Sequence, residues 1–110
     1  MIRIVAPWIL ARGVAGMALW PFLIARAKPL LSNARFVNHE RIHGRQQLEL
    51  LILPFYLWYV LEFLIRWLHT RNVNTAYRRI VFEREAYAMD TQTDYLMRRP
   101  FWAFLKFYRS

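Results

Sequence analysis

The chain has 110 residues, of which 57% are hydrophobic and 17% aromatic, and its formal net charge is +9. This length predicts one domain over residues 1–110, with little chain left over for the walls of a substrate cleft. The absence of cysteine excludes a disulfide framework and thiolate-ligated zinc. So much apolar material in a small domain predicts apolar surface that contacts lipid or another protein, and the positive charge favours an anionic membrane.

The first 28 residues are apolar and are interrupted by prolines and glycines, so their pattern fits short strands and a broken helix equally well. Residues 29–33 have the composition of a loop or a helix start. A helix is expected over residues 36–53, which are rich in good helix formers, although Gly44 weakens it. Pro54 lacks a backbone donor and should kink or end this helix.

A second helix is expected over residues 55–70, where Glu62, Arg66 and His69 share one stripe. Arg66, four residues from Glu62, is the simplest partner for a carboxylate in such an apolar segment, and a buried functional acid is the alternative. The apolar run 50–61 is shorter than a membrane span and favours a buried or interfacial helix. The N-terminal segment lacks the pattern of a secretory leader.

Residues 71–74 are expected to form a turn, after which Thr75 can cap a third helix that ends near residue 90. A last amphipathic stretch covers residues 94–108, and Pro100 is expected to begin its second half. Together these elements predict a mainly α fold with a compact core of three or four helices. A short N-terminal β element is an option.

One motif carries chemistry. Residues 39–43 read His-Glu-Arg-Ile-His, the HExxH pattern, within the first expected helix. His39 and His43 are one helical turn apart, so both imidazoles can converge on one zinc ion, while Glu40 projects beside it and can accept a proton from water. The alternative is a chance match of three fixed positions.

A catalytic zinc needs a third protein ligand, and the third expected helix offers Glu83 and Glu85, which point in different directions. Glu83 shares a face with Ala86, Tyr87 and Asp90 and is the favoured ligand, with Glu85 in reserve. Ala86 leaves room for close helix packing, and Asp90 could orient a ligand histidine. Alternatively, both glutamates are solvated partners of the nearby arginines.

Several other residues have more than one interpretation. Gln46 and Gln47 lie three and four residues beyond His43 and could bond to a ligand, to the third helix or to solvent. Tyr87 could polarise a reacting carbonyl or simply pack between helices. Tyr59 is expected to pack or to lie at a lipid interface.

The chain resembles a minimal gluzincin, a zinc peptidase with HExxH on one helix and a glutamate on a later helix that often reads Glu-x-x-Ala-Asp. The segment Glu-Arg-Glu-Ala-Tyr at residues 83–87 is similar to that pattern. The resemblance implies a zincin-like core and a catalytic centre made of His39, His43, Glu83 as zinc ligands and Glu40 as general base. Tyr87 replaces the pattern's aspartate, and Asp90 is expected to substitute for it.

Residues 38–50 also resemble short bacterial proteins of unassigned function that carry an NHExxHxRQQxEL signature, an aromatic apolar helix and a FEREAY-like segment. This resemblance covers most of residues 20–108. It implies a shared fold and metal site and brings no substrate.

The expected function is therefore zinc-dependent peptide hydrolysis near a membrane, with Glu40 as the catalytic residue and a peptide or protein as substrate. The alternative is a small membrane-associated scaffold or regulatory subunit, in an oligomer or with a partner protein. Its zinc site would be structural or degenerate, with His69 or Glu85 as a fourth ligand. The basic residues are scattered and no recognition motif is present, so nucleic acid is not an expected partner.

Overall fold

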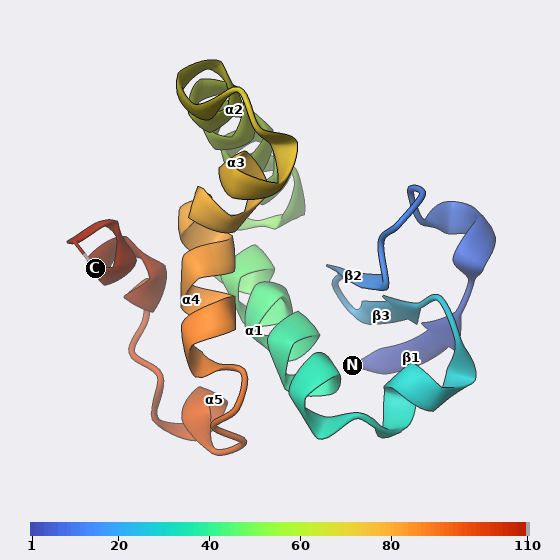
Figure 1. Cartoon of the computed structure of the whole chain (residues 1–110). Coiled ribbons are helices and arrows are strands. Elements are labelled where there is room, and N and C mark those ends of the chain that lie inside the picture. Colours follow the sequence, from blue (N-terminus) through green and yellow to red (C-terminus); the bar gives the residue numbers. More distant parts are fainter. Residues whose placement is uncertain (110) are drawn as a thin grey trace.

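The computed structural model describes residues 1–109 and is mainly helical, with a small three-stranded sheet at the N-terminus (Figure 1). The expected fold class is thus confirmed. The helices, in chain order, are α1 (Ala34–Leu50), α2 (Ile52–Thr70), α3 (Val73–Arg79), α4 (Val81–Met89) and α5 (Tyr95–Arg98). Three 3-10 turns lie at η1 (Pro7–Ile9), η2 (Lys28–Ser32) and η3 (Ala103–Arg109).

The N-terminal segment forms strands, which decides between the two options left open by its pattern. Strands β1 (Ile2–Val5), β2 (Gly16–Leu19) and β3 (Phe22–Ala25) lie in the order β1-β3-β2. β1 is parallel and β2 antiparallel to β3. The sheet packs beside α1 (Figure 1), and Gly44 leaves room there for the Met1 side chain, since an added Cβ would lie 2.8 Å from its sulfur.

The break between α1 and α2 falls at Leu51 and not at Pro54, so the prediction that the first helix reaches residue 53 was wrong. Leu51 has φ 67°, and the two helix axes diverge by 111°. Pro54 lies in the first turn of α2, where backbone N–H groups have no partner within the helix, so its missing donor costs little.

The expected third helix is interrupted at Ile80, whose ψ of 133° is extended, and it forms α3 and α4 instead. Asn72, and not Thr75, caps α3 by accepting a hydrogen bond from the backbone N–H of Thr75. The first backbone N–H of α4, at Val81, donates to Glu62 of α2 at 3.2 Å. A carboxylate from another helix thus caps α4 and helps to fix its position.

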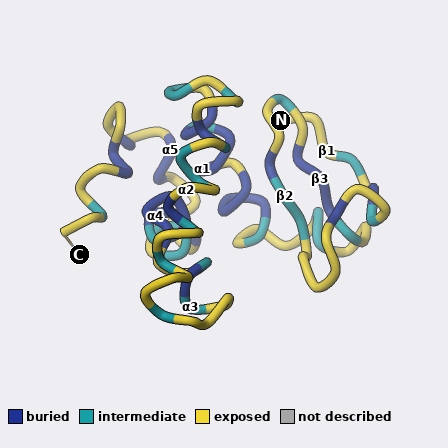
Figure 2. The backbone as a smooth tube through the Cα atoms, turned by 90° about the horizontal axis from the view of Figure 1, so that it is seen from above, coloured by how far each residue is buried: buried dark blue, intermediate teal, exposed yellow. Residues whose placement is uncertain are grey.

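The core has an aromatic part and a smaller part between α1 and α4. The first contains Phe55 of α2, Phe82 of α4 and Phe104 of η3. The second contains Ile42 of α1 and Ala86 of α4, both fully buried, which confirms the close packing expected at Ala86. The last stretch has two halves, as expected, but the second, η3, begins at Ala103 after a turn at residues 101–102 and not at Pro100. Figure 2 shows buried backbone on one side of α1 and α4, and much exposed backbone along α2 and α3.

Within residues 1–109, no single helix is long and apolar enough to cross a membrane. The bent pair formed by α1 and α2 meets the same length and composition test only when the two helices are taken together.

Candidate metal centre

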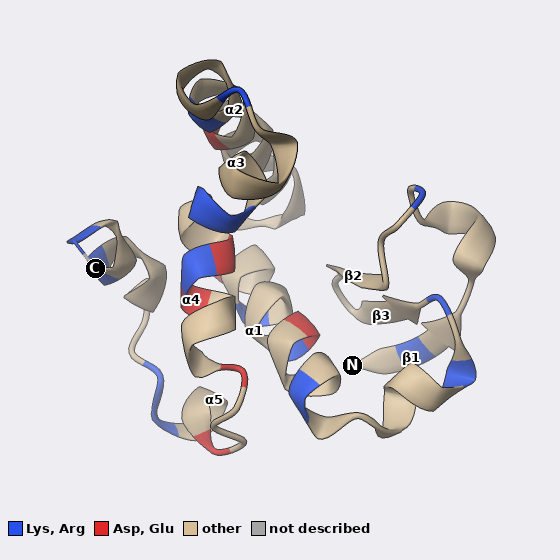
Figure 3. Cartoon of the chain, viewed as in Figure 1, with Lys and Arg blue, Asp and Glu red and all other residues tan. Residues whose placement is uncertain are grey.

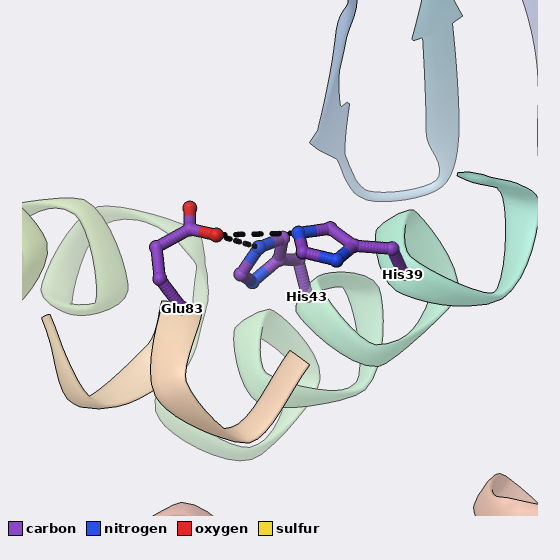
Figure 4. A group of neighbouring side chains, drawn as sticks. All are labelled: His39, His43 and Glu83. Carbon is purple, nitrogen blue, oxygen red and sulfur yellow. Dashed lines mark hydrogen bonds and ion pairs between the residues drawn. The ribbon is translucent and has the colours of Figure 1, made fainter. Parts of the chain in front are cut away.

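The centre is built on α1, which begins where Asn33 caps it by accepting a hydrogen bond from the backbone N–H of Phe36. His39 and His43 follow on one face of this helix, with ring centroids 4.9 Å apart and ring planes at 78°. Both residues are buried. Two imidazoles in this relation present their Nε2 atoms to one point on the α4 side of the helix (Figure 4).

The third member is Glu83, in the first turn of α4, where a negative charge is favoured by the helix dipole. Its Oε1 atom lies 3.2 Å from His39 Nε2 and 3.1 Å from His43 Nε2 (Figure 4). These three atoms lie within 4.8 Å of one another, and the group could hold a metal ion. The structure thus brings together the three residues that the sequence singled out as ligands.

The spacing of the three atoms fits a small divalent ion. Tetrahedral coordination with bonds of about 2.0–2.1 Å separates neighbouring ligand atoms by about 3.3–3.4 Å. The distances from Glu83 Oε1 to the two Nε2 atoms are only slightly shorter, at 3.2 and 3.1 Å. Small side-chain movements would suffice to admit an ion.

Both histidines have a defined partner on the far side of the ring. His39 Nδ1 lies 2.9 Å from Asp90 Oδ2, and Asp90 also accepts from Arg35 Nε at 2.8 Å. A carboxylate accepts only, so Nδ1 of His39 donates to Asp90, and Nε2 is left to face Glu83 or a metal ion. Asp90 thus occupies the orienting position that the sequence suggested for it.

His43 is oriented by Gln46, whose Oε1 lies 2.8 Å from His43 Nδ1. The orientation of the amide is fixed at its other end, because Gln46 Nε2 donates to the Phe82 carbonyl at 3.2 Å and to Glu85 Oε1 at 3.0 Å. The oxygen therefore faces His43, and Nδ1 of His43 also carries the proton. Of the options open for Gln46, the structure realises two at once, a bond to a ligand and a bond to α4.

Glu85 belongs to another buried cluster. It pairs with Arg99 through two contacts and accepts from the Tyr95 hydroxyl at 2.6 Å. Arg99 also donates to Glu49 of α1 at 2.7 Å. The reserve assignment of Glu85 as a metal ligand was therefore wrong, because all of its acceptor capacity is directed to Arg99, Tyr95 and Gln46. Arg99 lies 14 residues away in the chain, so helical spacing gave no signal for it.

Tyrosine side chains cover part of the centre. The Tyr59 hydroxyl donates to Glu83 Oε2 at 2.6 Å, so this residue has a polar role that sequence reasoning missed. Burial and the Glu83 carboxylate raise the pKa of Tyr59, and the phenol keeps its proton. The Tyr87 ring lies edge-on to His39 at 4.5 Å, with its hydroxyl 3.0 Å from that of Tyr77.

The remaining candidates lie elsewhere. Gln47 binds the sheet, accepting from the Trp20 backbone N–H and donating to the Ala18 carbonyl, both near 2.8 Å. Glu62 pairs with Arg66 at 3.1 Å, which confirms that expectation. His69 is exposed and lies outside the cluster of possible ligands.

The charges at the centre are strongly coupled. Burial disfavours a protonated His43, but the adjacent Glu83 carboxylate outweighs it and raises the pKa of His43 to about 9. Burial likewise disfavours the Glu83 carboxylate, yet His43 and His39 hold the pKa of Glu83 well below its usual range. Without metal, a proton bridges these side chains, and a metal ion would replace it.

Glu40 is 6% exposed, and within residues 1–109 its carboxylate accepts no hydrogen bond. Burial raises the pKa of Glu40, although the charges of His43 and His39 act in the opposite direction. A buried carboxylate with uncommitted oxygens beside a cluster of possible metal ligands has the properties of a general base.

No known protein family, curated protein or solved structure matches this chain.

Proposed function

We propose that the chain is a minimal zinc-dependent peptidase that hydrolyses a peptide bond. One observation carries the proposal: His39 Nε2, His43 Nε2 and Glu83 Oε1 converge, with both Nδ1 atoms bonded to fixed partners, beside an uncommitted Glu40. The order along the chain, with HExxH on α1 and the glutamate on the later α4, supports the gluzincin resemblance.

Zinc is the metal that this donor set favours, since two imidazoles and one carboxylate are typical of catalytic zinc sites with an open fourth position. Bound zinc supplies a Lewis acid that lowers the pKa of water and polarises a carbonyl oxygen. Asp90 and Gln46 would keep the two Nε2 lone pairs directed at the ion, and Tyr59 would hold the second oxygen of Glu83.

Glu40 would accept the proton of the attacking water and later deliver it to the leaving amine. Its raised pKa suits this exchange, because a base whose pKa is closer to neutrality can also act as an acid. The Tyr87 and Tyr77 hydroxyl pair, beside His39, would be a donor for the carbonyl oxygen of a substrate.

The test compares metal content with hydrolysis. The purified parent chain should hold about one zinc per chain by elemental analysis, and His43→Ala and Glu83→Ala should lose it. Glu40→Gln should keep the zinc and lose about 10²–10⁴-fold in the rate of cleavage of a mixed peptide library. Asp94→Asn, which changes an exposed acid, is the matched control and should behave as the parent.

A second candidate is the scaffold or regulatory role with a degenerate site, favoured by the burial of the ligand side chains, none of which is more than 10% exposed. Stoichiometric zinc with no cleavage by the parent, and no difference between the parent and Glu40→Gln, would favour this role. Absence of bound metal after zinc is supplied would contradict both candidates.

A further inference from the structure

The feature that the metal centre leaves unexplained is the outer face of α2, formed by Leu53, Leu57, Val60, Leu61, Leu64 and Leu68. These residues recur at steps of three and four, so they line one side of a 19-residue helix. Their exposure runs from 43% at Leu64 to 82% at Leu53. Soluble monomers rarely expose a continuous apolar surface of this kind without a partner.

The polar residues of α2 point the other way. Glu62 is buried, pairs with Arg66 at 3.1 Å, and accepts from the Tyr108 hydroxyl at 2.7 Å and from the N–H of Val81. Tyr59 is bonded to Glu83. The helix is thus inverted relative to a surface helix of a soluble protein, with its one carboxylate inward and its leucines outward.

A hollow of about 690 Å³ continues this apolar surface between α2 and η3 and is lined in part by Leu57, Leu61, Ile65 and Tyr108. The hollow is shallow and open. If α2 lay in a membrane interface, the apolar lining of this hollow would add to the apolar area that leaves water.

Charge identifies the partner. Among the described residues, Asp94 is the only exposed acidic residue. The other acidic residues are buried or half-buried. Exposed basic residues adjoin this surface, with Arg71 at the end of α2 and Lys106 and Arg109 on η3, whose Tyr108 lines the same hollow. Figure 3 shows Lys and Arg at the end of α2 and on the C-terminal η3.

We infer that the outer face of α2 lies in the interface of an anionic lipid bilayer, parallel to its surface, with the adjoining basic residues on the headgroups. An apolar stripe next to cationic side chains is the pattern that binds such a surface. A second copy of the chain is a poorer partner, because two molecules with a net charge of +9 repel each other. The inference is independent of the proposed hydrolysis.

The experiment measures binding of the metal-loaded full chain to vesicles by flotation. Phosphatidylcholine vesicles containing one quarter phosphatidylglycerol should bind it at low salt, and pure phosphatidylcholine vesicles should bind it weakly. Raising the salt to about 0.5 M should weaken binding to the anionic vesicles. The triple variant Leu57→Gln, Leu64→Gln, Leu68→Gln should lose binding by at least about tenfold.

A control changes apolar residues outside α2 that are even more exposed, in the triple variant Trp8→Gln, Met97→Gln, Phe101→Gln. This control should bind vesicles within about twofold of the parent, and both triple variants should retain the parent's metal content and thermal unfolding. No binding of the parent to anionic vesicles would overturn the inference, as would an equal loss in the control. A dimer of the parent in solution that the α2 variant converts to monomer, without vesicle binding, would assign the face to a second copy.

Discussion

Two regions reverse the usual distribution of side chains: the packed interface between α1 and α4, here called the seam, and the outer face of α2. The seam buries His39, His43 and Glu83 together with Gln46 and Glu85, while the outer face of α2 exposes leucines. In the seam most polar atoms have a partner; within residues 1–109 the exceptions there are the Glu40 carboxylate and one oxygen each of Asn38 and Glu49. On the outer face of α2, within residues 1–109, the leucines remain largely exposed.

This difference shows that burial is decided by partners and not by hydropathy alone. A carboxylate is stable inside when it is fully hydrogen-bonded, as Glu85 is by Arg99, Tyr95 and Gln46. A leucine remains outside when the chain is too short to cover it. The predictions below test how strongly each region depends on its partners.

The largest effect is expected from Arg99→Met, which leaves Glu85 and Glu49 buried without their cation. Breaking a buried ion pair by removing one partner costs about 3–5 kcal/mol of the free energy of unfolding. Urea unfolding checks this value. The adjacent Arg98→Met is the control, because the Arg98–Asp94 pair is exposed, and it should cost less than about 1 kcal/mol. Equal effects of the two variants would show that the seam does not depend on the Glu85 network.

The second effect is a pH dependence of the metal-free protein. His43 has a pKa raised to about 9 in the folded state, from 6.5, by Glu83, against the opposing effect of burial. A raised folded-state pKa contributes stability that is complete below pH 6.5 and is lost as the pH rises through about 9. The free energy of unfolding should therefore fall over this interval, by no more than about 3 kcal/mol.

Glu40 has a raised pKa as well, and its ionisation would also lower stability as the pH rises. The titration is therefore made in the Glu40→Gln variant, so that the bridge between His43 and Glu83 is observed alone. Zinc-loaded protein is the control, because the ion displaces the bridging proton, and its decline should be smaller. A flat profile in the metal-free variant would contradict the bridge.

The sequence predicted those features that depend on spacing within one helix. The two histidines at i and i+4, the shared face of Glu83 and Asp90, and the Glu62–Arg66 pair all follow from helical geometry. The mainly helical fold followed from composition and pattern. Each of these inferences uses residues no more than seven positions apart.

Contacts between distant segments could not be predicted in this way. Arg99 reaches Glu49 across 50 residues, and Tyr59 reaches Glu83 across 24, so neither partner is visible without the fold. The first helix break was predicted at Pro54 and lies at Leu51, which adopts a positive φ that usually marks glycine. The break at Ile80 was missed, because isoleucine does not signal one. The tertiary contacts around α4 prevail there over local preference.

A smaller effect is expected from Gln46→Met, which removes the acceptor for His43 Nδ1 while keeping the side-chain volume. Losing an outer partner of a metal ligand typically weakens metal affinity about 10–100-fold. Competition with a zinc chelator measures the change. Gln47→Met, in the next position of the same helix, is the control: it removes contacts to Trp20 and Ala18 of the sheet and should leave zinc affinity unchanged. Equal losses of affinity would mean that the histidine is held by packing alone.

The smallest effect is expected on the outer face of α2, from Leu57→Gln. Leu57 is 64% exposed, and glutamine is as good a helix former as leucine, so the free energy of unfolding in water should change by less than about 0.5 kcal/mol. Phe55→Ala, two positions earlier and 2% exposed, should cost about 3–5 kcal/mol because it empties the aromatic core. Urea unfolding of both variants measures the loss in free energy of unfolding on the exposed and the buried side of the same helix. A large loss at Leu57 would mean that this face is covered in solution, by a second copy of the chain, and a concentration-dependent unfolding midpoint would then be expected. A negligible loss leaves the leucines available to a partner outside the chain, as docking on an anionic bilayer requires.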